Sequence, residues 1–232
     1  MSRVAIETFP GAEAAAAAAA DAIVDQLRGA GPKRLMVTGG RGPGPVYDRL
    51  ANAELDWANV TVTLSDDRFV PLAAPESNEA MVRARLLQHR AAAARLVPLN
   101  GTEPTPAAAA AAIEPAIRAL LPFDATLLGM GPDGHIASLY ASSAGVAADL
   151  DPDASHLAVG VQSPGWEPYV PRISLTGRAL FDAGLIILLV GGKQKRHVIE
   201  QILADPAFNP PAAALIRQAH SPVRILWSPD AA

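Results

Sequence analysis

The sequence predicts an α/β fold, a doubly wound and mostly parallel Rossmann-like sheet with helices on both faces. Apolar segments rich in β-branched residues alternate with helical segments along the chain, and this alternation favours parallel βαβ crossovers. Glycine-rich turns follow three of the apolar segments, at the position where such a sheet presents its loops. The 232 residues, half of them hydrophobic, are enough for one sizeable core. We therefore expect a single domain over residues 1–232.

In the first half of the chain, residues 11–29 favour a helix because alanine is abundant and two glycines stand near its end. Residues 34–38 (RLMVT) have the pattern of a buried strand. Glycines come next, and a helix is then expected through about residue 53. Residues 60–64 alternate in the manner of a second strand. Residues 76–90 then favour another helix.

In the second half, residues 107–120 favour a helix that Pro115 is expected to break or kink. Residues 123–129 form the third clear strand pattern, and residues 184–190 (GLIILLV) form the most apolar one. The remaining expected segments are strands at 156–161, 172–175 and 223–227 and helices at 193–204 and 211–218. The region 141–183 is less regular, and we expect it to form a small antiparallel or mixed lobe beside the main sheet.

Charge and cysteine content exclude several classes of function. The formal net charge is −4, so the chain has no general attraction for nucleic acid or an anionic membrane. It holds no cysteine, which excludes disulfides, thiol catalysis and thiolate metal sites. The alanine run between Glu13 and Asp21 favours a helix over a signal peptide, and no window is apolar for long enough to span a bilayer. We expect a cytoplasmic protein.

Three glycine-rich turns predict one shared ligand site. Each of them follows an expected strand: Gly39-Gly40, Gly129-Met130-Gly131 with Gly134, and Gly191-Gly192. A parallel sheet places all three turns at the same edge, where backbone N–H groups and helix starts make a pocket for an anion. The chain contains neither GxGxxG nor GxxxxGK[ST], so nucleotide binding lacks support.

His135 is the candidate proton-transfer group. It follows the strand at 123–129 in a glycine-rich loop that also holds Asp133. Imidazole accepts a proton near neutral pH, and a neighbouring carboxylate fixes its tautomer and raises its basicity. The plainer interpretation is a histidine that caps a helix. The other four histidines lack comparable surroundings and show no metal-ligand spacing, and no GxSxG elbow is present. We expect no metal and no cofactor.

Three cationic residues are candidates for holding an anionic ligand. Lys193 opens the helix after Gly191-Gly192, where a cation is unfavourable unless an anion lies nearby. Arg68 and Arg172 carry guanidinium forks that suit phosphate or carboxylate. Asn78 opens a helix and suits a sugar hydroxyl. The alternatives are a solvated lysine, a surface turn and an ordinary edge-strand arginine.

Four motifs occur together in one order. They are Asp66–Pro71 (DDRFVP) with Ser77-Asn78, Leu127–Leu139 (LLGMGPDGHIASL), Pro171–Thr176 (PRISLT) and Gly191-Gly192-Lys193. In this order they resemble the 6-phosphogluconolactonase family, over a length from about residue 34 to the last strand. The resemblance implies a Rossmann-like fold related to glucosamine-6-phosphate deaminases. It also implies a cytosolic, cofactor-free hydrolase that opens 6-phospho-D-glucono-1,5-lactone in the oxidative pentose phosphate pathway.

The resemblance further implies residue roles. His135 is the general base on water, and Asp133 is its supporting carboxylate. Arg68, Arg172 and Lys193 surround the phosphate. The full set implied in substrate binding is Gly39, Gly40, Arg41, Asp67, Arg68, Asn78, Gly131, Gly134, Arg172 and Lys193.

The sequence departs from the family pattern in three places. Arg41-Gly42-Pro43 follows the first two glycines, whereas the family usually has Ser-Thr-Pro, so two hydroxyls are missing. Arg41 either adds a cation for the phosphate or folds away. Tyr140-Ala141 replaces the usual Phe-Pro, and Asp67 replaces a glutamate. These changes bear on the phosphate geometry more than on the reaction.

Two other functions remain open. One is a sugar-phosphate isomerase or deaminase of the same fold, although Ser138-Leu139 stands where deaminases carry Phe-Asn-Glu-Pro. The other is a non-catalytic sugar-phosphate sensor, although such proteins normally carry a DNA-binding segment and have no need of the Asp133/His135 pair. The expected partner is a small phosphorylated sugar lactone, with no nucleic acid and no membrane. We expect a monomer or a weak homodimer.

Overall fold

The main sheet consists of seven strands, all of which pair in parallel. A computed structural model describes residues 4–162 and 169–230. In spatial order the strands are β1 (Val4–Thr8), β10 (Val223–Ser228), β9 (Ala183–Gly191), β6 (Phe123–Gly129), β2 (Lys33–Val37), β3 (Val60–Leu64) and β5 (Arg95–Val97). The predicted α/β class and parallel sheet are confirmed.

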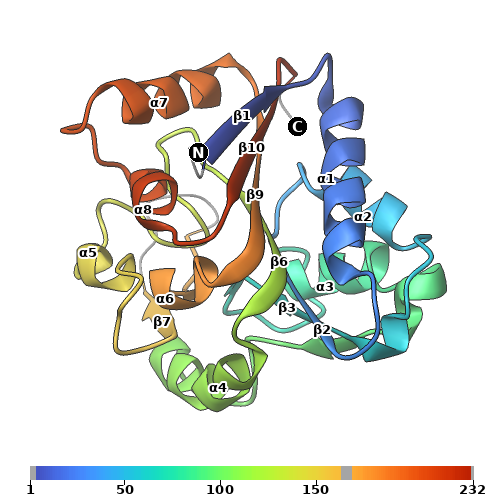
Figure 1. The fold of residues 1–232 in the computed structure, drawn as a ribbon. Coiled ribbons are helices and arrows are strands. Elements are labelled where there is room, and N and C mark those ends of the chain that lie inside the picture. The colour runs from blue at the N-terminus through green and yellow to red at the C-terminus, as the bar shows by residue number, and fades with distance from the viewer. Residues whose placement is uncertain (1–3, 163–168, 231–232) are drawn as a thin grey trace.

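Helices cover both faces of this sheet, as Figure 1 shows with α1 on one side and α7 and α8 on the other. The helices are α1 (Ala12–Leu27), α2 (Gly44–Leu50), α3 (Asn78–Arg85), α4 (Pro106–Leu120), α5 (Val146–Asp149), α6 (Gly177–Leu180), α7 (Lys193–Ala204) and α8 (Pro211–Gln218). The described residues also include two 3₁₀ turns, η1 (Trp57–Asn59) before β3 and η2 (His89–Ala93) before β5. In the described ranges no helix is both long and apolar enough to cross a bilayer.

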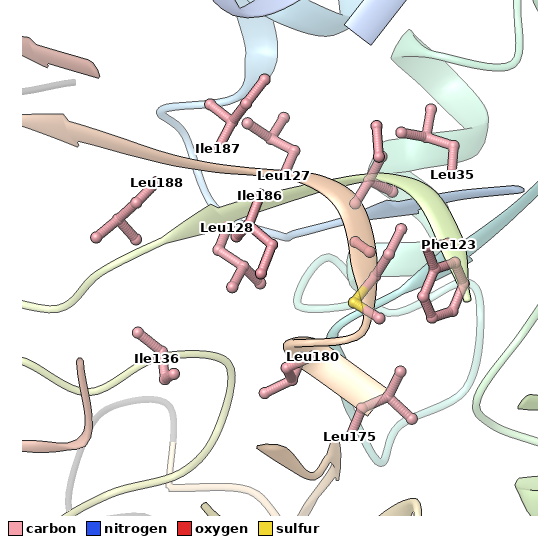
Figure 2. Close-up of a cluster of buried hydrophobic side chains, with 14 of the residues drawn as sticks. Leu35, Phe123, Leu127, Leu128, Ile136, Leu175, Leu180, Ile186, Ile187 and Leu188 are labelled. Carbon is pink, nitrogen blue, oxygen red and sulfur yellow. The ribbon is translucent and has the colours of Figure 1, made fainter. Parts of the chain in front are cut away.

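The core lies around the two central strands, β6 and β9. Leu127, Leu128 and Ile186–Leu188 have no exposed surface, and Figure 2 shows their side chains among other buried apolar groups. Strands of a parallel sheet that is covered on both faces are apolar at successive positions. Burying each such side chain contributes about 1.5–3 kcal/mol. This burial is why the GLIILLV run becomes a central strand.

A second, three-stranded sheet stands beside the first. Its order is β4 (Asp66–Arg68), β8 (Arg172–Leu175) and β7 (Ala158–Val161), and both pairings are antiparallel. The predicted lobe at 141–183 is therefore antiparallel where it is described, and residues 163–168 lie outside the described residues. The lobe also includes β4, which lies just beyond the strand expected at 60–64 and had no strand of its own in the prediction.

Several element boundaries differ from the prediction. The helix expected at 76–90 begins at Asn78, because Ser77 accepts the N–H of Ala80 (3.1 Å) as its N-cap, and it ends at Arg85. The helix before residue 53 ends at Leu50, and strands β1 and β5 had no counterpart in the prediction. Helix α4 continues through Pro115, with buried residues on both sides of the proline, so the expected break does not occur.

Candidate active site

The strand order reverses between β2 and β6, and a cavity lies at that point. After β2 the chain adds β3 and β5 on one side, whereas after β6 it adds β9 and β10 on the other. In doubly wound sheets, ligands bind beyond the carboxyl ends of the strands where the order reverses. A cavity of about 420 Å³ is lined there by Thr38 and Gly39 after β2 and by Gly129 and Gly131 at the end of β6.

His135 lines this cavity, and Asp133 holds its ring. The imidazole Nδ1 lies 2.6 Å from Asp133 Oδ1, and the same oxygen accepts the His135 backbone N–H at 3.2 Å. Burial acts to raise the pKa of Asp133, but the hydrogen bond and charge of His135 outweigh it, so the pKa lies below its usual value. A carboxylate that stays ionised and binds Nδ1 directs proton uptake to Nε2.

Two glycines allow this loop to close tightly. A Cβ on Gly131 would lie 2.2 Å from the His135 ring, and a Cβ on Gly134 would lie 2.7 Å from Pro210. Gly134 also has a φ of +83°, which favours glycine. The fully buried Ile136 then fixes the loop in the hydrophobic cluster of Figure 2. Gly134 therefore shapes the loop and does not line the cavity.

Arg68 and Arg172 form a facing pair across the small sheet. They are register partners in the β4–β8 ladder, and both line the cavity. Burial, reinforced by the charge of Arg68, lowers the pKa of Arg172. Nε of Arg68 is buried and has no hydrogen-bond partner within the described residues. Because like charges opposite one another destabilise a sheet, this pair is suited to an anion that both guanidinium groups bind.

Strand alternation separates the two aspartates of β4. Asp66 lines the cavity, whereas Asp67 is fully buried and lines no part of it. Asp67 accepts the backbone N–H groups of Arg68 and Asn78 at 2.7 Å and of Glu79 at 3.1 Å. Asp67 therefore caps α3 and lies away from the cavity, because successive side chains of a strand point to opposite faces. Its expected substrate contact stays a prediction.

Asn78 also lines the cavity, but its amide is engaged within the protein. Its Oδ1 accepts from Arg68 Nη1, and its Nδ2 donates to the Asp66 carbonyl at 3.0 Å. A Cβ on Gly39 would lie within 2.2 Å of this amide, so only glycine permits the close approach. Asn78 therefore orients Arg68, which adds to the predicted hydroxyl contact a role that the sequence did not indicate.

The lysine that lines the cavity is Lys195, and Lys193 is not among the lining residues. Lys193 is exposed at the first position of α7, whereas Lys195 is partly buried. Two residues along an α-helix turn the side chain by about 200°, so the two lysines point in different directions. Burial, followed by the charge of Arg41, lowers the pKa of Lys195. Lys193 therefore lies outside the cavity lining, and its expected contact with the phosphate stays a prediction.

The first glycine-rich turn contributes its backbone and one cation. Gly39, Gly40 and Arg41 all line the cavity, so Arg41 does not fold away from it. The charge of Arg41 acts on Lys195, which comes from α7 on the other side of the strand reversal. Two segments that are far apart in the chain therefore bring positive charge to the same cavity.

Most of the predicted site residues meet in this cavity. Those that line it are Gly39, Gly40, Arg41, Arg68, Asn78, Gly131, His135 and Arg172, whereas Asp67, Asp133, Gly134 and Lys193 do not. Lining residues that the sequence reasoning missed include Asp66, Lys195 and Ser228. Alternation along β4 and the helical period of α7 were the signals that point to the first two.

A doubly wound sheet with an imidazole–carboxylate pair and four cations at one cavity defines an α/β enzyme for an anionic substrate. The family model described as glucosamine-6-phosphate isomerases/6-phosphogluconolactonase matches residues 10–227. The chain therefore belongs to this family, and the resemblance seen in its motifs is confirmed.

Relatives over the full length point to one branch of the family. A protein of Caulobacter vibrioides named 6-phosphogluconolactonase is 41% identical over 96% of this chain and 97% of its own length. A protein of Rhizobium meliloti with the same name is 39% identical over 95% of this chain and 97% of its own length. A solved 6-phosphogluconolactonase of Shewanella baltica is 33% identical, covers 97% of both chains and has a TM-score of 0.87. A monomeric glucosamine-6-phosphate deaminase, 20% identical with a TM-score of 0.80, shares the fold.

Proposed function

We propose that the protein hydrolyses 6-phospho-D-glucono-1,5-lactone to 6-phospho-D-gluconate, with His135 as general base. The observation that carries the proposal is the meeting of the Asp133–His135 pair with Arg41, Arg68, Arg172 and Lys195 around one cavity. The printed names of the relatives that match over the full length supply the substrate. The whole chain, residues 1–232, serves as one hydrolytic domain in this proposal, and it acts in the cytoplasm.

The first chemical step is attack by water on C1 of the lactone. Nδ1 of His135 hydrogen bonds with Asp133, so the water proton goes to Nε2, and the oxygen forms its bond to C1. The ionised Asp133 stabilises the imidazolium that results. A general base of this kind contributes roughly 10²- to 10⁴-fold in rate. The lactone carbonyl is already electrophilic, so deprotonation of the attacking water by His135 is enough to start the reaction.

The second step breaks the ring ester. The bond from C1 to the ring oxygen breaks, and the proton held on Nε2 of His135 passes to that oxygen as it becomes a hydroxyl. The new carboxylic acid then loses its proton to water. Backbone N–H groups of the glycine-rich turns donate hydrogen bonds to the carbonyl oxygen as negative charge develops on it. One such donor is worth about 3 kcal/mol when it is removed.

The phosphate orients the lactone from the far end. Arg68 and Arg172 face each other in the ladder, and Lys195 and Arg41 add charge from α7 and the first turn. Binding energy from this remote dianion places C1 against the attacking water. In this proposal Lys195 has the role that the sequence assigned to Lys193. A chain of net charge −4 attracts its anionic substrate only through these local cations.

The direct test compares three substrates with the parent enzyme. We expect kcat/KM for the phosphorylated lactone to exceed that for plain glucono-1,5-lactone by at least about 100-fold, because charge-assisted hydrogen bonds contribute about 1.5–3 kcal/mol each. Glucosamine 6-phosphate serves as the control for the isomerase or deaminase alternative. Equal use of both lactones contradicts the phosphate assignment, and turnover of glucosamine 6-phosphate with none of the lactone contradicts the proposed reaction.

A further inference from the structure

Tyr140 packs against the candidate general base, although it does not line the cavity. Its ring centroid lies 4.5 Å from that of His135, with the two planes inclined by 44°. The side chain is 2% exposed. A β-bridge pairs Leu139 with Ile136, so the chain folds back at this point. This fold brings Tyr140, the next residue, against the imidazole. This position carries the departure from Phe-Pro noted in the sequence.

Asp133 fixes one atom of the imidazole but does not fix the pair in space. Asp133 and His135 stand two residues apart on the same loop, and their side chains are 35% and 19% exposed. A carboxylate and an imidazole on one loop can move together, because their mutual hydrogen bond is kept as the loop moves. A rigid, buried neighbour on another side of the ring is needed to stop that motion. Tyr140 is such a neighbour.

The other contacts of Tyr140 tie it to the small sheet. Its ring lies 6.0 Å from the Arg172 guanidinium carbon, at the outer limit of a cation–π contact. Ser138, two residues earlier, donates from its hydroxyl to Asp66 Oδ2 at 2.6 Å and from its backbone N–H to Ser174 Oγ at 3.2 Å. Tyr140 thus contacts the imidazole from a segment that hydrogen bonds tie to β4 and β8.

We propose that Tyr140 is a positioning residue, whose ring holds the His135 imidazole in its catalytic orientation against the arginine-bearing sheet. This inference rests on the proposed general-base role of His135. The aromatic ring does the positioning, and its burial keeps it against the imidazole. The alternative is that Tyr140 only fills the core of the lobe, in which case its loss lowers stability and leaves the chemistry of bound substrate intact.

Three variants separate these roles in the kinetic assay. Tyr140→Leu removes the ring, Tyr140→Phe removes only the hydroxyl, and Phe181→Leu removes a buried aromatic ring of the same lobe that is 3% exposed. We expect Tyr140→Leu to lower kcat about tenfold and to change KM by less than about twofold, because misplacing a reacting group is costly while binding is retained. We expect Tyr140→Phe to keep kcat within about threefold, and Phe181→Leu to keep the parental kcat.

A second readout needs no substrate. In the ligand-free protein, the proton between His135 Nδ1 and Asp133 is followed as a low-field NMR resonance. It is expected in the parent and in Tyr140→Phe, and to be lost through exchange with water in Tyr140→Leu. If Tyr140→Leu does not fold, as judged by thermal unfolding, Tyr140→Met replaces it in both measurements.

The outcomes are distinct. If Tyr140→Leu keeps the parental kcat and the resonance, Tyr140 has only a packing role in the core. If Tyr140→Phe lowers kcat tenfold, the role belongs to the hydroxyl and not to the ring. Either result overturns the inference. If the parent does not hydrolyse the lactone at all, the proposed function fails, while the NMR comparison still decides whether Tyr140 holds the imidazole.

Discussion

The two sheets contribute to the candidate site in different ways. The seven-stranded sheet contributes loops and a helix start, which carry His135, Arg41 and Lys195 beyond the ends of its strands. The three-stranded sheet contributes residues within its strands, Arg68 on β4 and Arg172 on β8. Loop residues are positioned by glycines and local hydrogen bonds, whereas strand residues are positioned by ladder register. The candidate general base therefore stands on a loop, whereas two of the candidate anion-binding residues stand in register within strands.

The largest expected effect comes from the loop half of the site. His135→Ala is expected to lower kcat by at least about 100-fold with the fold intact, because a general base contributes roughly 10²- to 10⁴-fold. His156→Ala is the matched control, since His156 also bonds a carboxylate, Asp149 at 2.8 Å, and does not line the cavity. A continuous assay with freshly generated lactone measures both. Equal activity of the two variants contradicts the role of His135.

The next effect comes from the strand half. Arg172→Met is expected to lower kcat/KM about 30-fold, mostly through KM, because a charge-assisted contact to phosphate is worth about 1.5–3 kcal/mol. Arg178→Met, on α6 of the same lobe, is the control; Arg178 donates to the Ala154 carbonyl at 3.0 Å. The double variant with Arg68→Met sharpens the comparison. If the facing arginines bind one anion, the free-energy losses of the two single variants do not sum to the loss of the double variant. Strictly additive losses would mean that the two arginines act independently.

A smaller effect distinguishes the two lysines of α7. Lys195→Ala is expected to raise KM about tenfold and to leave kcat nearly unchanged, because it removes one point charge that binds ground state and transition state alike. Lys193→Ala is expected to change KM by less than about twofold. Steady-state kinetics on the phosphorylated lactone measure both constants. A larger change from Lys193 than from Lys195 reverses the assignment made from the cavity.

The smallest effect is a pH dependence of stability that the strand half carries. Burial raises the pKa of Asp67 to about 6, above the value of roughly 3.9 in an unfolded chain. The folded form binds this proton more tightly, so Asp67 favours folding at low pH and that contribution is lost as the pH rises through 6. Between pH 4 and 6 the parent should lose stability relative to Asp67→Asn, on the order of 1 kcal/mol per pH unit.

Urea unfolding at pH 4.5, 5.5 and 6.5 checks this dependence. Effects of other titrating groups cancel when the parent is compared with the variant at each pH. If the free energies of unfolding of the parent and Asp67→Asn change in parallel with pH, the pKa of Asp67 is not raised. In that case the backbone N–H groups offset the effect of burial. The loop half has no such buried carboxylate, so the dependence belongs to β4.

The sequence indicated candidate residues in both halves of the site, but it indicated the spatial arrangement only in the loop half. A glycine-rich turn after an apolar run identified His135 and its neighbourhood, because the chemistry and its position are local in the chain. The facing of Arg68 and Arg172 depends on the register between segments about a hundred residues apart, and no local pattern encodes it. The strand β4 itself consists of three polar residues (DDR), and it is a strand only because β8 lies beside it.

Two of the predicted substrate contacts lie outside the cavity lining for a simple physical reason. Asp67 was assigned to the substrate without regard to strand alternation, which turns Asp66 and Arg68 toward the cavity and Asp67 away from it. Lys193 was assigned from its place beside the glycines, although the helical period turns Lys195 inward. In contrast, β3, β6 and β8 begin and end at the predicted residues, and most of their residues are buried.

The pairing of β1 with β10 has a consequence for how the molecule is made. Among the described strands, β1 (residues 4–8) pairs with β10 alone (residues 223–228), and the ribosome adds β10 long after it has added β1. Ser228 at the end of β10 accepts the Gly192 N–H at 3.0 Å and forms part of the cavity wall. A growing chain therefore completes the wall of its pocket with the last of the described strands to be synthesised.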